Sequence, residues 1–493
     1  MKLRVEGIEL GGKFEIEMEF WNGDLLIGFD KVLMKVAPFE LRNQTMPVSS
    51  CGPNEKTVYI SISPYFYSRN NEKLRNKLRE ISPNGYGDCL DEVTDPLSYD
   101  IWHQDGYEIG RAGGMVIFLV SPRAYRDVWG EDAVLARYVH NERLAPGIGV
   151  CWRLEGMEWS TYDSFGNVEC RPSGNNLFCG SGLNEDIKAF FEAQGVNPRL
   201  EVNTSWLSVK HVDEVVSFMT NGDTVVADPV VYLGLCVWAN SISWNAVPSP
   251  RGYTAYDILK NDGIFRDYNS NTTVVPAMNQ IRSVLGLANP LTDPVKNGDP
   301  QLQSNLKRGG ALTAMLPADV STRKYKISFD QGDNIHFSVS YEDNGSGSWS
   351  TDIDFYGCYL TAAQSGTGPE HIKIDADCIF KESLCFILSD FWENTGQIAP
   401  GDYFIFEVSA NCTTLEMPVI FFNGDAYSIN HVNSLVDGGK VFSGSTHESN
   451  TGDVFKNYVE KVFNKAGLST IFADSRLYHY LDGDIHCGTN VQR

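Results

Sequence analysis

The run WLSVKHVDE at residues 206–214 places His211 two positions before Asp213. If residues 209–213 form a β-strand, Val209, His211 and Asp213 project to one face, because side chains along a strand alternate with period two. An imidazole and a carboxylate on one face can work as an acid/base pair. A buried histidine held by a structural aspartate is the other interpretation, and it is the commoner one for an isolated His-x-Asp. The surrounding sequence has to distinguish the two.

The segments on either side of this run alternate between strand and helix patterns. Val58–Ile62 and Met115–Val120 are short apolar runs of the kind found in buried strands. Apolar residues at helical spacing, which indicate helices with one buried face, occur at Leu74, Leu78 and Ile81, at Ile187, Phe190 and Phe191 after a capping Asn184, and at Val454, Tyr458, Val459 and Val462 before Gly467. A strand is expected at 470–473. This alternation predicts the α/β class.

Two regions depart from the alternation. In residues 1–40, apolar and charged residues alternate from Phe14 to Phe20, and Asn22-Gly23 leads into a second apolar stretch, which predicts a half-buried hairpin left over from a β-sandwich. Residues 291–415 are rich in Gly, Ser, Asn and Asp, and two alternating runs flank a turn at 331–333, which predicts a β-rich insertion. The α/β domain then consists of two parts, 41–290 and 416–493.

Composition narrows the class of function. The 493 residues include 63 acids and 40 Lys plus Arg, so the formal net charge is -23. Such a chain repels phosphate and attracts cations, which argues against nucleic-acid binding. No apolar run approaches the ~20 residues that span a bilayer, and no secretion signal is evident, so we expect a cytoplasmic protein, or a secreted one if a longer parent chain has a leader. The eleven cysteines contain no Cys-x-x-Cys pair, which makes a zinc site improbable.

Three more short runs combine residue types that active sites use. Trp102–Glu108 reads WHQDGYE and brings together an aromatic ring, an amide and two acids. Asp163–Glu169 reads DSFGNVE, a turn with an acid, as calcium sites need. Asp482–Asn490 reads DGDIHCGTN, in which the glycine beside Cys487 permits close approach of a ligand and so suits a nucleophile. Taken singly, these runs are more often a solvated loop, an ordinary turn and a small core cysteine.

Together the runs resemble the catalytic domain of protein-arginine deiminases, which are guanidino-group-modifying enzymes with a pseudo-fivefold α/β propeller. The similar segments occur in the family's order and leave out the insertion. They are Lys35–Phe39, Trp102–Gly110, Ser121–Arg123, Asp163–Glu169, Trp206–Phe218 and Ile485–Val491.

The resemblance implies a role for each catalytic residue. Cys487 is the nucleophile, His211 is the general acid/base, and Asp105 and Asp213 grip the guanidinium group of the substrate. It also implies that Trp102 packs on the arginine stem and that Arg123 touches the peptide backbone of the substrate. Because two carboxylates disfavour a nearby thiolate, we expect the pKa of Cys487 to be raised in the empty site and lowered when a cation binds.

The family requires calcium, and one calcium site has counterparts in this chain. Side-chain ligands fall on Gln104, Glu108 and Glu169, and backbone-carbonyl ligands fall on Phe165 and Val168, all oxygen donors as a hard cation requires. A second site lacks them, because its acidic and amide ligands fall on Gly106, Val120 and Ala124. We therefore expect fewer bound calcium ions and a weaker calcium dependence than in animal relatives.

The expected activity is calcium-dependent conversion of peptidyl-arginine to peptidyl-citrulline, with arginine-containing proteins or peptides as partners and no nucleic acid or membrane. Two substrate-side arginines of the family fall on Tyr125 and Leu481, which weakens the expected grip on a peptide. A deiminase of free arginine or another small guanidine therefore stays open, as does an inactive calcium-binding relative. The oligomeric state cannot be inferred.

Overall fold

A computed structural model of the chain describes its residues in stretches separated by gaps. These are 13–35, 37–41, 58–62, 71–80, 90–93, 101–125, 138–151, 159–171, 176–195, 198–219, 221–229, 231–232, 235–236, 253–254, 257–258, 265, 268–269, 273–287, 295–296, 312–315, 323–329, 336–343, 348, 358–359, 370–372, 385–388, 403–408, 414–437, 439–445 and 453–491. The statements below concern these residues.

Five sheets in the described part of the chain share one strand arrangement. Each has a central strand with an antiparallel neighbour on one side and a parallel neighbour on the other. The sheets are β6 (Tyr107–Ala112), β7 (Met115–Val120) and β8 (Ile148–Cys151); β9 (Val168–Arg171), β10 (Asn176–Gly180) and β11 (Arg199–Val202); β12 (Val216–Phe218), β13 (Thr224–Asp228) and β22 (Thr414–Pro418); β25 (Leu435–Asp437), β26 (Lys440–Ser445) and β27 (Ser469–Asp474); and β28 (Thr489–Val491), β4 (Val58–Ser61) and β5 (Leu90–Val93). A short strand, β3 (Phe39–Glu40), extends the first sheet beside β6.

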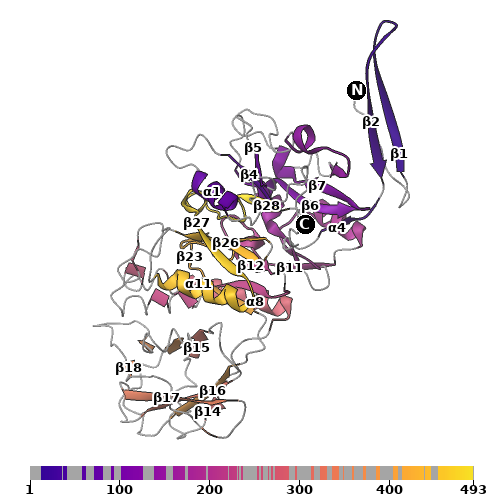
Figure 1. Ribbon diagram of the computed structural model, residues 1–493. Coiled ribbons are helices and arrows are strands. Elements are labelled where there is room, and N and C mark those ends of the chain that lie inside the picture. The colour runs from indigo at the N-terminus through magenta and orange to yellow at the C-terminus, as the bar shows by residue number, and fades with distance from the viewer. Residues whose placement is uncertain are drawn as a thin grey trace.

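A helix joins the central strand of each sheet to its parallel neighbour, because a parallel connection has to cross over. These helices are α1 (Glu72–Glu80), α4 (Glu185–Gln194), α8 (Val274–Leu285), α11 (Val454–Lys465) and a short π-helix, η3 (Val139–Arg143). The repeated unit is thus strand, strand, helix, strand, and in the last sheet its first strand, β28, comes from the other end of the chain (Figure 1). The predicted α/β class is confirmed.

The sequence explains why these helices begin and end where they do. The Asn184 side chain accepts a hydrogen bond from the backbone N–H of Asp186 at 2.9 Å, which caps α4 as predicted. Asp453 caps α11 by accepting from the backbone N–H groups of Phe455 and Lys456. Gly195, with φ of 64°, ends α4 in a left-handed conformation that glycine adopts without strain. Ile81, expected on the face of α1, lies outside the described residues.

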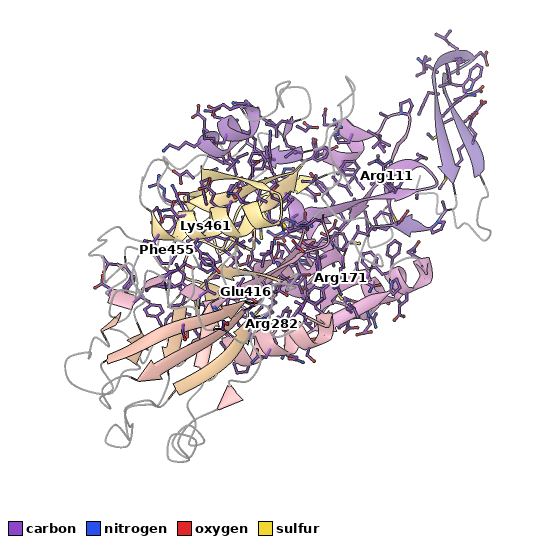
Figure 2. All side chains as sticks on the ribbon, turned by 60° about the horizontal axis from the view of Figure 1, so that its bottom comes forward. Arg111, Arg171, Arg282, Glu416, Phe455 and Lys461 are labelled. Carbon is purple, nitrogen blue, oxygen red and sulfur yellow. The ribbon has the colours of Figure 1, made fainter. Side chains whose placement is uncertain are left out.

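The helices pack their apolar faces on the sheets. One buried network of ion pairs also connects a helix to two strands. Arg282 of α8 pairs with Asp228 of β13 at 3.1 Å and with Glu416 of β22, close to Arg282 in Figure 2. Burial raises the pKa of Glu416 to about 8, although Arg282 opposes that shift. The network links the two strands that lie on either side of the long stretch 229–413.

The N-terminal segment is a two-stranded hairpin of β1 (Lys13–Asn22) and β2 (Leu25–Lys35) that extends away from the body of the molecule (Figure 1). The predicted hairpin is present, but the expectation of a half-buried strand is wrong. Phe20, Leu25, Ile27 and Phe29 are 51–68% exposed, because no second sheet covers the hairpin in the described structure.

Strands also form in the region predicted as a β-rich insertion. β16 (Arg323–Phe329) pairs with β17 (His336–Asp343) and β21 (Tyr403–Val408), in a sheet that includes β14 (Val295–Lys296) and β18 (Cys358–Tyr359). A second sheet contains β15 (Leu312–Met315), β19 (Glu370–Ile372) and β20 (Cys385–Leu388). Within the described residues, these strands pair only with one another. The turn expected at 331–333 lies outside them.

None of the helices in the described part of the chain is both long enough and apolar enough to cross a bilayer.

Candidate active site

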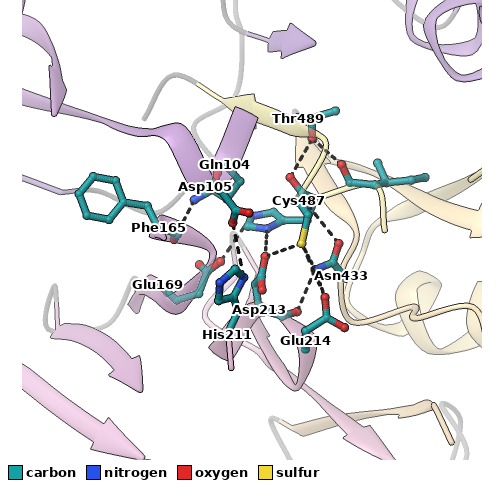
Figure 3. A network of polar contacts seen from close by, with 12 residues as sticks. Gln104, Asp105, Phe165, Glu169, His211, Asp213, Glu214, Asn433, Cys487 and Thr489 are labelled. Atoms are coloured by element: carbon teal, nitrogen blue, oxygen red, sulfur yellow. Dashed lines mark hydrogen bonds and ion pairs between the residues drawn. The ribbon is translucent and has the colours of Figure 1, made fainter. Parts of the chain in front are cut away.

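The candidate site lies where the first strands of the five sheets begin. Asp105 precedes β6, Gly166 precedes β9, Asp213 precedes β12, Asn433 precedes β25, and Cys487 precedes β28. Each residue is within three positions of its strand, so each repeated unit places a different residue at the same position relative to its sheet. Residues from distant parts of the chain thereby meet in one network (Figure 3).

The sulfur of Cys487 lies among acids and an amide. Its Sγ lies 3.2 Å from Asp213 Oδ2 and 3.6 Å from Glu214 Oε1, and Asn433 Nδ2 donates to the sulfur at 3.0 Å. Burial, followed by the charges of Asp213, Glu214 and Asp105, raises the pKa of Cys487 well above its ordinary value. The expected direction of the shift is therefore present, with burial as a larger cause than the carboxylates.

The segment around His211 is not the strand that its alternation suggested. Lys210 has a left-handed backbone with φ of 66°, His211 is extended, and Val212–Glu214 form a turn of 3-10 helix, η6. The expectation of a strand over 209–213 is wrong because the turn closes on itself, with the Val215 N–H donating to the Val212 carbonyl. The consequence is functional: Asp213 and Glu214 both reach the sulfur, whereas neighbours in a strand face opposite sides.

His211 is held in one orientation by the backbone. Its Nε2 is 2.9 Å from the carbonyl oxygen of Thr161, and since a carbonyl can only accept, Nε2 carries a proton. Its Nδ1 is 3.4 Å from Asp105 Oδ1. The atom of His211 that is free to exchange a proton with a ligand in this site is therefore Nδ1.

Gly166 shows how closely these groups converge. A methyl group on Gly166 would lie 2.8 Å from both Asp105 Oδ1 and His211 Nδ1, and 3.1 Å from Asp213 Oδ2. Three of the four predicted catalytic side chains thus surround one point of the backbone, and Asp213 connects that point to the fourth, Cys487. The structure brings together all four.

The two residues predicted to contact substrate also border this network. The ring of Trp102, half-buried, covers Gly483, where a methyl group would lie 2.6 Å from the ring and 3.4 Å from Cys487 Cβ. Arg123 is buried, and its Nη1 lies 2.8 Å from Asp105 Oδ2. A contact between Arg123 and a peptide backbone stays a prediction, since here its guanidinium group faces Asp105, a predicted catalytic acid.

The predicted calcium ligands form an oxygen-rich group beside the predicted catalytic residues. Gln104 Nε2 donates to Glu108 Oε1 at 2.7 Å and to the Phe165 carbonyl at 3.5 Å, and both side chains are fully buried. The NH₂ group of Gln104 thus lies between two oxygen atoms, where a positively charged group is favourable. If the amide turned over, its own oxygen would join these two, and three oxygens would face the same place. The donor set therefore fits a calcium ion.

Glu169 and Val168 complete this group from β9. Val168 is buried and donates its N–H to the Phe165 carbonyl. Glu169 Oε1 is 3.4 Å from His486 Nε2, and His486 Nδ1 is 3.0 Å from Asp213 Oδ2. One imidazole thus bridges a predicted calcium ligand and a predicted catalytic acid.

Sequence reasoning missed five residues of the network: Gly166, Glu214, Asn430, Asn433 and His486. Glu214 and His486 adjoin Asp213 and Cys487, so their position in the runs was a usable signal. The asparagines lie in residues 427–434, where no pattern pointed to function. Asn430 Nδ2 donates to Glu214 Oε2 at 2.8 Å, and Asn433 accepts from the backbone N–H of Cys487 at 3.2 Å.

Comparison with known proteins finds a family to which part of the chain is similar. Residues 26–228 match the family model of protein-arginine deiminase (PAD). Human protein-arginine deiminase type-3 is 26% identical over 219 residues, which are 39% of this chain and 30% of the human protein. The chain thus matches less than a third of that relative's length, and Cys487 lies outside the segment matched by the family model.

Solved structures are similar only at a low level. C. jejuni agmatine deiminase is 9% identical, with a TM-score of 0.42 over 93% of this chain and 97% of the other. A substrate-bound variant of that enzyme gives the same TM-score and identity over 94% and 98%. These values are too low to bear on the site, whereas the sequence matches are specific. Over residues 26–228, the chain is similar to the protein-arginine deiminase family.

Proposed function

We propose that this protein hydrolyses the guanidinium group of peptidyl-arginine, releasing ammonia and leaving peptidyl-citrulline, by way of a covalent adduct on Cys487. The observation that carries the proposal is the convergence of an imidazole and two acids at Gly166, with the thiol of Cys487 in contact with one of those acids. A guanidinium group is planar and cationic, and its N–H groups suit in-plane hydrogen bonds to two carboxylates. Asp105 and Asp213 provide those carboxylates.

In the proposed mechanism, each residue has a step. The two acids fix the guanidinium carbon beside the sulfur of Cys487, which attacks it as a thiolate. His211 Nδ1 gives a proton to the departing nitrogen, which leaves as ammonia, and then takes a proton from the water that hydrolyses the thiouronium adduct. Arg123 must yield part of its contact with Asp105 when the substrate cation arrives, since both compete for one carboxylate.

Calcium dependence and the propeller are the finer parts of the proposal. Gln104, Glu108 and Glu169, with the carbonyls of Phe165 and Val168, would hold a calcium ion, which would supply charge compensation for the buried acids. The chain of contacts from Glu169 through His486 to Asp213 supports an effect of that site on the catalytic acid. The five sheets of repeated strand order support a pseudo-fivefold propeller.

Ammonia release is the direct test of the activity. We expect turnover of benzoyl-arginine amide that is lost in C487A and reduced, though not abolished, by a calcium chelator. Free arginine and agmatine are tested in parallel, and faster turnover of either would favour the small-guanidine alternative. No turnover of any of the three with calcium present would leave an inactive relative as the better description.

A further inference from the structure

Glu214 is a buried acid in direct contact with the sulfur, and the mechanism above does not use it. Its carboxylate is held at both oxygens: Oε2 accepts from Asn430 Nδ2 at 2.8 Å, and Oε1 accepts from Asn433 Nδ2 at 3.2 Å. Asn430 Nδ2 also donates to the Glu214 carbonyl at 2.9 Å. Oε1 is the oxygen that lies 3.6 Å from Cys487 Sγ. The acid is therefore fixed in place and aimed at the nucleophile.

The groups that face Glu214 are anions, amides and a thiol. Burial and the carboxylates of Asp213 and Asp484 raise its pKa well above the ordinary value, and the bonds from Asn430 and Cys487 only partly oppose this. One atom from each of Asp213, Glu214 and Cys487 lies within 4.8 Å of the other two. Three negative charges in so small and dry a space would repel strongly. The arrangement of Asp213, Glu214 and Cys487 is therefore more stable when the three residues keep one proton between them.

The other candidates for the thiol proton are occupied by other tasks. The contacts of His211 are the Thr161 carbonyl and Asp105, and it must hold a proton for the leaving nitrogen. Asp213 lies 3.2 Å from the sulfur, but it must stay ionised to bind a guanidinium group, and it already contacts His486. Glu214 has no such duty, since its partners are two amides that remain in place whether it is ionised or neutral.

We propose that Glu214 is a further catalytic residue that shares one proton with Cys487, taking it when the sulfur attacks and returning it when the sulfur leaves. This rests on the proposed function, in which Cys487 is the nucleophile. As the S–C bond to the guanidinium carbon forms, the S–H bond breaks and its proton passes to Glu214 Oε1. When water displaces the sulfur, the S–C bond breaks and the same proton returns to Cys487. His211 takes one proton of the water, and the other passes to solvent, where it protonates the released ammonia. Neither step requires another reactant.

Alkylation of Cys487 by iodoacetamide at neutral pH tests the proposal without any guanidine substrate. Glu214→Gln keeps the size of the side chain but cannot accept the proton, so we expect alkylation to slow by about tenfold or more, the effect of one pKa unit. If Glu214 is only an anion beside the thiol, removing its charge lowers the pKa of Cys487 and speeds alkylation. A faster or unchanged rate therefore overturns the proposal.

Glu416→Gln is the matched control, because Glu416 is equally buried but contacts Arg282. Its alkylation rate should equal that of the wild type, and thermal unfolding of each variant shows whether it is folded.

A measurement on the unchanged protein covers the case in which Glu214→Gln does not fold. Alkylation of a thiol releases iodide and a proton, which a pH indicator counts; subtracting the count for C487A removes the other cysteines. We expect almost no proton from Cys487, because Glu214 retains it, and release of a full proton overturns the proposal. Failure of the ammonia assay with this result intact would count against the proposed function alone, because alkylation does not depend on the substrate.

Discussion

At the residue scale, the site depends on a backbone position that has no functional group of its own. Gly166 lies where Asp105, His211 and Asp213 come closest together, and its missing side chain leaves the space in which they meet. In the proposed mechanism Asp105 and Asp213 bind one cation together, so a displacement of either by a fraction of an ångström would weaken that binding. We therefore expect the absence of a side chain at Gly166 to be as important for activity as the two acids.

Substitution of this glycine should therefore abolish most activity while leaving the protein folded. In Gly166→Ala, the new methyl group lies too close to all three side chains, so we expect kcat/KM for benzoyl-arginine amide to fall by about 10²-fold. Gly28→Ala is the control, because its methyl group would meet only the Phe20 ring at 3.9 Å. Retention of wild-type kcat/KM in Gly166→Ala, measured by citrulline formation, would contradict this account of the site.

At the element scale, the segment 427–434 lies between β24 (Asp425–Ala426) and β25. It contacts Cys487 through Asn433 and Glu214 through Asn430. A small hydroxyl network holds this segment: Ser443 Oγ is 2.9 Å from His431 Nδ1, and Ser434 Oγ donates to the His431 carbonyl at 2.8 Å. Burial, with a smaller effect of Lys456, lowers the pKa of His431 to about 3. The segment is therefore built around a neutral imidazole.

This imidazole predicts a loss of stability in acid. Below the ordinary pKa of 6.5, the unfolded chain binds a proton at His431 that the folded protein excludes until about pH 3. The contribution is complete above pH 6.5 and is lost as the pH falls, with a limiting slope of about 1.4 kcal/mol per pH unit. We expect urea unfolding of His431→Gln to show a smaller decrease between neutral pH and pH 5 than the wild type does.

Glu416 offers a comparison of opposite sign in the same experiment. Its folded pKa of about 8 exceeds the ordinary 4.5, so its contribution is present below pH 4.5 and is lost as the pH rises toward 8. Glu416→Gln should therefore remove a decrease in stability between about pH 4.5 and about pH 8. If both variants and the wild type showed the same pH dependence of stability, the folded protein would not keep His431 unprotonated or Glu416 protonated as described.

At the scale of the whole molecule, the excess of acid bears on the substrate rather than on the fold. The net charge of -23 gives the protein a negative potential at long range, which draws cations toward it. An arginine-rich peptide carries several charges that feel this potential, whereas free arginine carries a single side-chain cation. Long-range attraction should therefore depend on the number of cationic residues in the substrate.

Salt provides the test of this attraction. Raising the ionic strength from about 0.01 M to about 0.15 M shortens the screening length from about 30 Å to about 8 Å. We expect kcat/KM for a peptide with several arginines to fall several-fold over this range, mainly through KM, while kcat/KM for a peptide with one arginine and no net charge changes little. A loss of the same size for both peptides would indicate an effect of salt on the site itself.

Local patterns in the sequence were enough to predict many of the strands and helices and to name residues with suitable chemistry. Apolar spacing predicted the strands β4 and β7 and the helices α4 and α11, because burial of one face depends on neighbours a few positions away. It failed at 209–213, where Lys210 adopts a left-handed conformation and a 3-10 turn replaces the expected strand. An alternating run carries no information on whether a partner strand lies beside it.

The sequence by itself determined the α/β class, the strong negative charge, and which acids, histidine and cysteine were candidates for the site. Only the tertiary structure brought Glu214 and Asn433 to the sulfur and left room for the acids at Gly166. The physical reason is separation along the chain: Asn433 and Cys487 are 54 residues apart, and Asp213 and Cys487 are 274 apart. Their contacts depend on how five sheets pack together, which no local spacing encodes.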